Sequence, residues 1–304
     1  METLVQIEPA AALRPPRPEW LRVRMPGGDN YHHLKALARQ LSLHTVCESA
    51  RCPNIGDCWN RGTATFMILG NLCTRRCGFC AVPKGRPLPL DTDEPRRVAE
   101  AVLRLRLRHA VITSVDRDDD NLGGARIFSQ TIAAIHARLP ECSVEVLIPD
   151  FRGSEAALRI VLDAGPQILN HNTETVPELY RFVRPGAQFE RSLELLRNVK
   201  RFAPGMLSKS GLMLGLGETE AQLFAALQRL AATGCDILTL GQYLRPSRNH
   251  LPVKRMYTPE EFAAIKVQAL ALGFGHVEAG PLVRSSYHAR DQAEQVVPRA
   301  LPMQ

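Results

Sequence analysis

The chain has 304 residues, and its 38 Lys plus Arg outnumber 31 Asp plus Glu, giving a formal net charge of +7. Its 45% hydrophobic and 23% charged residues are typical of a soluble globular protein with a sizeable core. No apolar run approaches the roughly 18 residues of a membrane helix, and the N-terminus lacks the pattern of a secretion signal. We therefore expect a cytoplasmic protein without membrane contact.

The positive charge allows two interpretations. It indicates either a merely basic enzyme surface or a surface that binds an acidic protein or an anionic small molecule. Basic residues are scattered and do not alternate with aromatic residues, so we expect no nucleic-acid partner.

The first 28 residues are rich in Pro and Gly and have no period, so we predict a flexible N-terminal arm over 1–28. Apolar residues at helical spacing predict a helix over 30–43, with Asp29 or Asn30 as its cap. Three cysteines follow in a predicted loop over 47–62. We treat 29–62 as an N-terminal extension of the main domain.

From residue 64 onward, predicted strands and helices alternate. The strands are expected at 65–69, 109–114, 143–148, 167–171, 208–214 and 236–240. The helices are expected at 93–108, 125–139, 154–164, 175–183, 188–202, 219–233 and 259–272. This order predicts an α/β fold with a parallel sheet, and without a linker it favours a barrel or partial barrel over 63–275. We treat 276–304 as a C-terminal extension.

Six of the eight cysteines lie between Cys47 and Cys80. In a reducing cytosol, clustered cysteines are more often metal ligands than disulfides. Cys142 and Cys235 stand alone, and we interpret them as plain buried residues.

Cys73, Cys77 and Cys80 place three thiols within eight residues, on the loop that leaves the first strand of the barrel. Thiolates suit an iron–sulfur cluster or zinc. Three ligands leave one iron of a cubane open, whereas zinc would need a fourth ligand and the loop contains no His. A zinc knuckle or free thiols are the alternatives.

This Cx3Cx2C spacing, with Phe79 before the last cysteine, resembles the radical S-adenosylmethionine (SAM) superfamily. The resemblance implies a partial (βα)6 TIM-type barrel. It also implies that SAM binds the open iron and is cleaved by one electron to a 5′-deoxyadenosyl radical, with Phe79 near the adenine. General acid–base side chains are then not needed, because the cofactor carries the difficult chemistry, and we predict no catalytic side chain.

Cys47, Cys52 and Cys58 form a second group, whose spacing alone would also suit zinc. Together with the Cx3Cx2C loop, it resembles the lipoyl synthase family. The likeness begins at about residue 30, with the first 28 residues outside it, and also rests on these segments: TSVDRDD (113–119), NHNTETVP (170–177), RPGAQFERSL (184–193), KSGLMLGLGE (209–218), GQYLRPS (241–247) and GPLVRSSYHA (280–289).

The resemblance implies insertion of two sulfur atoms, at C6 and C8 of an octanoyl chain on the lysine N6 of a carrier protein. One 4Fe-4S cluster, which binds SAM, would be held by Cys73, Cys77 and Cys80. An auxiliary 4Fe-4S cluster, the sulfur source, would be held by Cys47, Cys52, Cys58 and a serine, for which we prefer Ser286 to Ser285. The implied partners are octanoylated glycine cleavage H protein and 2-oxoacid dehydrogenase E2 subunits, a ferredoxin or flavodoxin type reductant, and an iron–sulfur carrier for cluster rebuilding.

Other polar residues follow predicted strands. Gly215, Gly217 and Glu218 would alone indicate a turn, but the resemblance implies contact with SAM. Asn172 and Glu174 are expected near SAM or substrate rather than in a plain polar turn. Arg184 is a candidate for anion binding, with a surface salt bridge as the alternative.

Asp116 to Asp120 departs from the family pattern, and alone it would suit a calcium-like loop or a solvated charge run. The remaining alternatives are a biotin synthase, a methylthio-transferase, or a non-catalytic zinc or nucleic-acid-binding protein.

Overall fold

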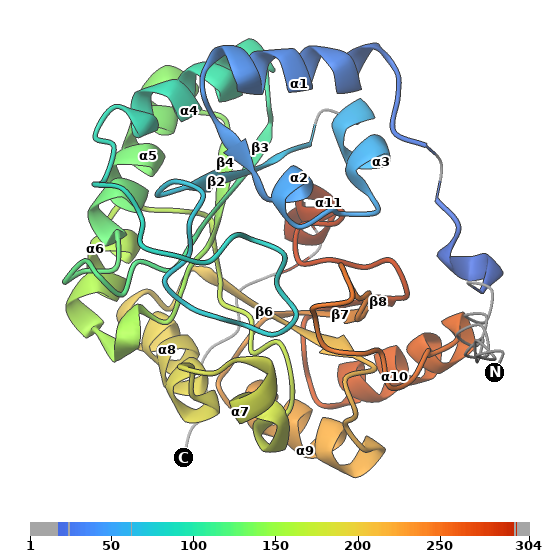
Figure 1. Ribbon diagram of the computed structural model, residues 1–304. Helices are drawn as coiled ribbons and strands as arrows, with labels where there is room; N and C mark the ends of the chain where they lie inside the picture. Colours follow the sequence, from blue (N-terminus) through green and yellow to red (C-terminus); the bar gives the residue numbers. More distant parts are fainter. Residues whose placement is uncertain (1–17, 24, 62, 295, 297–304) are drawn as a thin grey trace, which may run out of the picture.

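One sheet of eight strands forms the centre of the protein (Figure 1). The computed structural model describes residues 18–23, 25–61, 63–294 and 296. Neighbouring strands follow chain order and are parallel, except that the first pairs antiparallel with the second. The strands are β1 (His44–Thr45), β2 (Thr65–Ile68), β3 (His109–Ser114), β4 (Ser143–Leu147), β5 (Ile168–Asn170), β6 (Leu207–Leu214), β7 (Ile237–Gln242) and β8 (His276–Gly280).

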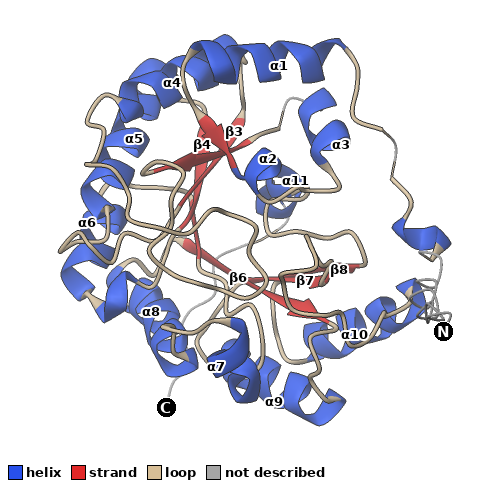
Figure 2. Cartoon of the chain, in the orientation of Figure 1, coloured by secondary structure: helices blue, strands red, loops and turns tan. Residues whose placement is uncertain are grey.

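Helices connect the parallel strands and form an arc around the outside of the sheet (Figures 1 and 2). The α-helices are α1 (Asp29–Gln40), α2 (Val46–Ser49), α3 (Ile55–Asn60), α4 (Glu94–Arg104), α5 (Ala125–Arg138), α6 (Glu155–Asp163), α7 (Tyr180–Val183), α8 (Phe189–Phe202), α9 (Glu220–Ala231), α10 (Pro259–Ala271) and α11 (Ala289–Glu294). Short 3-10 helices are η1 (Glu19–Leu21), η2 (Phe151–Gly153) and η3 (Pro177–Leu179). Among the described residues, none of these helices has the length and apolarity to cross a membrane.

Local sequence explains where many helices begin. Thr219 and Thr258 each close a capping box at the start of α9 and α10, and Ser154 accepts a hydrogen bond from the Ala157 N–H at the start of α6. The apolar faces of these helices bury residues against strands that are themselves almost wholly buried, such as β2 and β7.

The predicted α/β partial barrel is confirmed, and its six predicted strands correspond to β2 through β7. Two further strands were missed. β1 has only two residues, and β8 is a short segment whose one buried residue is Val277, so neither presents an apolar run. They extend the sheet at its two edges.

The predicted loop over 47–62 was wrong, because it contains two short helices. Thr45 caps α2 by accepting a hydrogen bond from the Glu48 N–H, and α3 begins after Asn54. Of the predicted arm, residues 1–17 lie outside the described part of the chain, and η1 lies within the remainder.

Candidate active site

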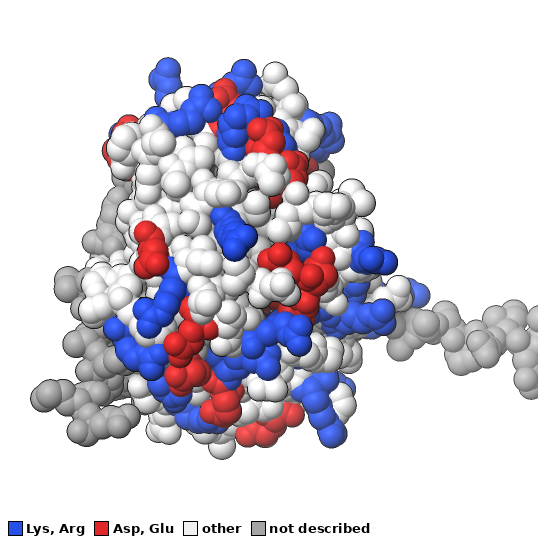
Figure 3. All heavy atoms as spheres, turned by 90° about the vertical axis from the view of Figure 1, so that its left-hand side faces the viewer, with Lys and Arg blue, Asp and Glu red and all other residues white. Residues whose placement is uncertain are grey.

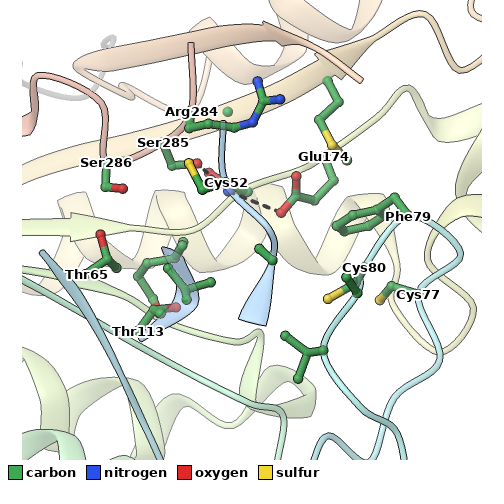
Figure 4. A pocket seen from close by; sticks show the side chains of 18 of the residues that line it. Cys52, Thr65, Cys77, Phe79, Cys80, Thr113, Glu174, Arg284, Ser285 and Ser286 are labelled. Carbon is green, nitrogen blue, oxygen red and sulfur yellow. Dashed lines mark hydrogen bonds between the residues drawn. The ribbon is translucent and has the colours of Figure 1, made fainter. Parts of the chain in front are cut away.

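A cavity of about 590 Å³ opens at the carboxyl ends of the parallel strands. Barrel enzymes carry their active sites at this end of the strands. Five of the six clustered cysteines line it, and so do both candidate serines and four predicted cofactor contacts: Cys47, Cys52, Cys73, Cys77, Cys80, Ser285, Ser286, Phe79, Asn172, Glu174 and Arg184. Figure 4 shows Cys77 and Cys80 at one side and Cys52 with the serines at the other, with Glu174 between them. All eight cysteines are free thiols.

The second triad lies on a loop that backbone hydrogen bonds hold at several points. Cys73 donates its N–H to Pro83 O at 2.9 Å, and Gly78 donates to Val183 O at 2.9 Å. Gly78 is required here, because a Cβ would lie 2.9 Å from the Leu251 side chain and 3.1 Å from Phe182 O. The loop is thereby fixed against the two loops that follow β5 and β7.

Arg75, between two cysteines of this triad, has a side chain only 4% exposed and ion-pairs with three carboxylates. Its guanidinium lies 2.8 Å from Asp118, 2.5 Å from Asp150 and 3.3 Å from Asp116. Asp116 in turn donates its N–H to Cys73 Sγ at 3.4 Å. The acidic segment after β3 is therefore neither a calcium loop nor a solvated run: it holds the cysteine loop in place.

Two opposite charges lie beside the second triad. Arg184 is buried and donates from Nη1 to Asn172 O at 2.8 Å, while its Nε has no hydrogen-bond partner among the described residues. Burial raises the pKa of the Cys77 thiol to about 12, and the nearby Arg184 charge opposes that rise. Burial also raises the pKa of Glu174, against the opposing charge of Arg184. The pair offers one cation and one carboxylate to a ligand in the cavity.

The first triad is assembled from α2, α3 and the turn between them. Burial and then the neighbouring Cys52 raise the pKa of Cys47 to about 11, and burial followed by Cys47 and Cys52 raises that of Cys58 to about 12. This mutual repulsion means that the three thiols lie close together. Cys58 belongs to the group although it does not line the cavity.

The segment after β8 reaches the first triad from the far end of the chain. Asn54 donates to Leu282 O at 2.7 Å and so joins the start of α3 to this segment. The charge of Arg284 acts on the Cys52 thiol. Ser285 Oγ accepts a hydrogen bond from Asn172 Nδ2 at 2.7 Å, whereas Ser286 lines the cavity without a hydrogen bond to any described residue.

Gly215, Gly217 and Glu218 are not among the cavity-lining residues. The Glu218 carboxylate accepts three backbone N–H groups of its own loop, from Gly215 at 2.6 Å, Leu216 at 2.9 Å and Gly217 at 3.0 Å. Gly215 has φ +96°, and a Cβ there would collide with Arg255 O. These residues shape a turn, and contact with SAM stays a prediction for them.

The donor sets fit clusters better than single ions. No three His, Cys, Asp or Glu side chains in the described ranges converge as one metal ion requires. A cubane binds each thiolate at a different iron, so its ligands stand further apart, and thiolates are the ligands iron–sulfur clusters take.

Sequence reasoning missed several residues of this site, above all Arg75, Arg284 and Glu145. Glu145 is a fully buried carboxylate that lines the cavity from β4. A signal existed for it, because a single Glu within the apolar run SVEVL is costly unless it is paired. For the arginines, only tertiary contacts distinguish them from surface residues.

The fold and the cysteine loop agree with comparisons to known proteins. A model of the radical SAM superfamily matches residues 67–230. The FeFe-hydrogenase maturase HydG from Carboxydothermus hydrogenoformans shares the fold, with a TM-score of 0.57 and 14% identity over 88% of this chain and 70% of that one. The Streptococcus suis SuiB structure bound to precursor peptide SuiA gives a TM-score of 0.56 at 10% identity, over 91% of this chain and 58% of that one. The chain is thus a radical SAM enzyme, with the 4Fe-4S cluster and SAM that this class implies.

More similar relatives define the family. A lipoyl synthase of Koribacter versatilis is 63% identical over 95% of each chain, and one of Rubrobacter xylanophilus is 60% identical over 91% of this chain and 87% of that one. The chain belongs to the lipoyl synthase family, whose chemistry is sulfur insertion. This assignment excludes the alternatives of a biotin synthase, a methylthio-transferase and a zinc or nucleic-acid-binding protein.

A model of the N-terminal domain of lipoyl synthase matches residues 5–52. The expectation that the first 28 residues fall outside the resemblance was therefore wrong. The segment lacks the periodicity on which the sequence argument relied.

Proposed function

We propose that this enzyme inserts sulfur at C6 and C8 of an octanoyl chain on a carrier lysine, with a cluster on each cysteine triad. The observation that carries the proposal is a single cavity lined by cysteines of both triads, with Cys52 on one side and Cys77 and Cys80 on the other. When bound, the two clusters and SAM would supply the reductive sulfonium cleavage and the inserted sulfur.

The residues around the second triad would position SAM. Cys73, Cys77 and Cys80 would hold the cluster, and three ligands leave one iron free. Arg184 would bind the carboxylate of the methionine part of SAM, because its Nε has no hydrogen-bond partner among the described residues. Glu174 would accept hydrogen bonds from the amino group or ribose, and Phe79 would lie against the adenine.

At the first triad, Cys47, Cys52 and Cys58 would hold the auxiliary cluster, with Ser286 as its fourth ligand. Ser285 already accepts the Asn172 amide, which favours Ser286. A hydroxyl oxygen is a hard ligand and matches iron poorly beside soft thiolates, so it would leave readily during sulfur transfer.

Apolar side chains between the triads would receive the acyl chain. Met67, Val111, Leu147, Leu212 and Met213 all line the cavity. They favour a saturated chain over water and would keep water away from the reacting carbons.

The cavity mouth suits an acidic carrier protein. Arg51, Lys84 and Arg245 are the exposed charged residues that line the cavity, and all are cations. In the described part of the chain, none of them forms an ion pair with a carboxylate. By contrast, basic and acidic side chains are intermixed on the face shown in Figure 3. Between α5 and α4, Arg138 Nη1 lies 2.6 Å from Glu100 Oε2.

These cations would attract the acidic surface around a carrier lysine. We propose octanoylated H protein and dehydrogenase E2 subunits as carriers, with a ferredoxin or flavodoxin type reductant and an iron–sulfur carrier that rebuilds the cluster. The free thiols support a reducing, cytoplasmic setting.

The test is anaerobic purification followed by turnover with SAM, a reductant and an octanoylated carrier domain. We expect a brown protein with roughly eight irons, as two 4Fe-4S clusters require. Mass spectrometry should show two sulfur atoms added to the carrier. A protein with about four irons, or a carrier without added sulfur, would contradict the two-cluster proposal.

A further inference from the structure

The deep end of the cavity has a different character from its walls. The deepest lining residues in β2, β3 and β4 are Thr65, Val111 and Glu145, and strand pairing places them opposite one another. Two residues further along each strand come Met67, Thr113 and Leu147, again in register. The first set therefore forms the floor of the cavity and the second set forms its walls.

Glu145 lies on this floor and forms a buried ion pair with Lys209, which is not itself among the cavity-lining residues. Its carboxylate lies 3.1 Å from Lys209 Nζ, and both side chains are 0% exposed. Asn170 Nδ2 donates to the same carboxylate at 3.1 Å, and His109 Nε2 lies 3.6 Å away. We call Glu145 and Lys209 the floor pair.

The Glu145 carboxylate of the floor pair is ionised at neutral pH. Burial alone would raise the pKa of Glu145, but the Lys209 charge and the contact with His109 lower it to about 2. Desolvating a pair of charges is costly and is offset only where the partners remain in place. The floor pair therefore resists displacement by an incoming ligand.

The depth of the cavity suits a chain that enters methyl end first. Glu145 at the floor and Pro149 toward the mouth both line the cavity. Pro149 is four residues further along the chain, and at about 3.3 Å per residue this separates the two by roughly 13 Å along the strand direction. Between these levels the walls include Met67 and Leu147. A medium-length saturated chain fills such a depth, with its carrier lysine at the mouth.

We propose that the floor pair is the stop against which the methyl end of the acyl chain rests, so that it sets the chain length the enzyme accepts. The inference rests on the proposed function. A chain longer by two methylenes would press apolar carbon against a fixed ion pair. A chain shorter by two would leave apolar wall unfilled. Each methylene in an apolar site changes kcat/KM by about 10–200-fold.

The test compares hexanoyl, octanoyl and decanoyl carriers on the holoenzyme. Glu145→Ala with Lys209→Met removes both charges together and opens space, whereas changing one partner alone would leave a buried charge unpaired. We expect the decanoyl-to-octanoyl ratio of kcat/KM to rise at least tenfold. Calorimetry of each carrier binding to the holoenzyme without SAM should show the same change of preference.

Two further variants separate the stop from general damage. Lys200→Met with Asp236→Leu removes another fully buried ion pair, which does not line the cavity, and should leave the ratio unchanged. Val111→Phe adds bulk at the floor and should shift preference toward hexanoyl, which keeps the proposal testable if the first variant does not fold.

The outcomes are distinct. Wild-type enzyme that binds and thiolates octanoyl carrier, with folded floor variants that keep the wild-type chain-length ratios, would overturn the stop alone. Wild-type enzyme that does not thiolate octanoyl carrier would overturn the proposed function instead.

Discussion

Both triads contribute cysteines to the same cavity but are held in different ways. The second triad is on one continuous loop, and Arg75 ties that loop to three carboxylates from the segments after β3 and β4. The first triad comes from two short helices, and the segment around Arg284 completes its surroundings from more than two hundred residues away. Among the described residues, few hydrogen bonds join the two short helices to the segment around Arg284. One of them runs from Asn54 Nδ2 to Leu282 O at 2.7 Å.

The difference matches the work proposed for each cluster. A centre that is used again in every turnover benefits from ligands held by a buried ion-pair network. A centre that gives up sulfur must be opened and rebuilt, which is easier where its last ligand lies on a separate segment.

The largest effect is expected from single cysteine changes. Cys77→Ala should abolish SAM cleavage, because it removes a ligand of the cleaving cluster. Cys52→Ala should leave SAM cleavage, and some hydrogen abstraction, but give no thiolated product. Liquid chromatography of 5′-deoxyadenosine and mass spectrometry of the carrier measure both. Lipoyl product from Cys52→Ala would show that the first triad is not the sulfur source.

The next effect distinguishes the two serines. Ser286→Ala should lower thiolated product roughly 10-fold or more, the scale seen when support of a metal site is lost. Ser285→Ala should cost less, since its hydroxyl is engaged by Asn172. Product yield in a single turnover, with SAM cleavage as the control, measures both. A larger loss in Ser285→Ala would reverse the assignment.

Arg75→Met should destabilise the cluster-free protein by about 3–5 kcal/mol, because it leaves the fully buried Asp150 without its main partner. Arg191→Met is the matched control. Arg191 lies 3.2 Å from the same carboxylate but is partly exposed, so we expect about 0–1 kcal/mol. Urea unfolding gives both values, and equal losses would contradict a special role for Arg75.

The smallest effect is a difference in pH response. Burial would raise the pKa of Asp150, but hydrogen bonds and charge from Arg75 hold it well below its usual range. The ionised carboxylate therefore stabilises the fold above its unfolded pKa, and this stabilisation is lost as pH falls through the folded value. Unfolding of cluster-free protein between about pH 5 and pH 3 should show the onset of this loss, and Arg75→Met should flatten it.

The first triad should respond to alkali instead. Folded pKa values of about 11 for Cys47 and about 12 for Cys58 lie above the ordinary value of 9.0. Thiols of the unfolded chain ionise first as pH rises, so stability should fall above about pH 9 and continue falling through the folded values. The double change to Ala should reduce this slope, and Cys77, whose folded pKa is also raised to about 12, should keep part of it. An unchanged slope would mean that Cys47 and Cys58 do not contribute to it.

Much of this molecule could be predicted from sequence, for identifiable reasons. The strands β2 through β7 are apolar runs between amphipathic helices, and their order alone indicates a barrel. The short β1 and β8 depend on pairing with neighbours, and α2 depends on one cap at Thr45, so local patterns did not reveal them.

The spacing of the cysteines predicted two groups, and the structure places five of these six cysteines on one cavity. The turn of Glu218 shows the limit, because the same carboxylate suits a ligand contact or its own backbone, and only the folded loop shows the backbone contacts. Lys209 and Glu145 are 64 positions apart, so no local pattern joins them.

The position of Ser286 also has a consequence for how the enzyme is made. A ribosome delivers the chain from its N-terminus, so the second triad and the ion-pair partners of Arg75 are all available once Asp150 has emerged. The first triad emerges earlier still, yet Ser286, its proposed fourth ligand, is made more than 200 residues after Cys58. The proposed auxiliary cluster would therefore be completed only after Ser286 has emerged, long after its three cysteine ligands.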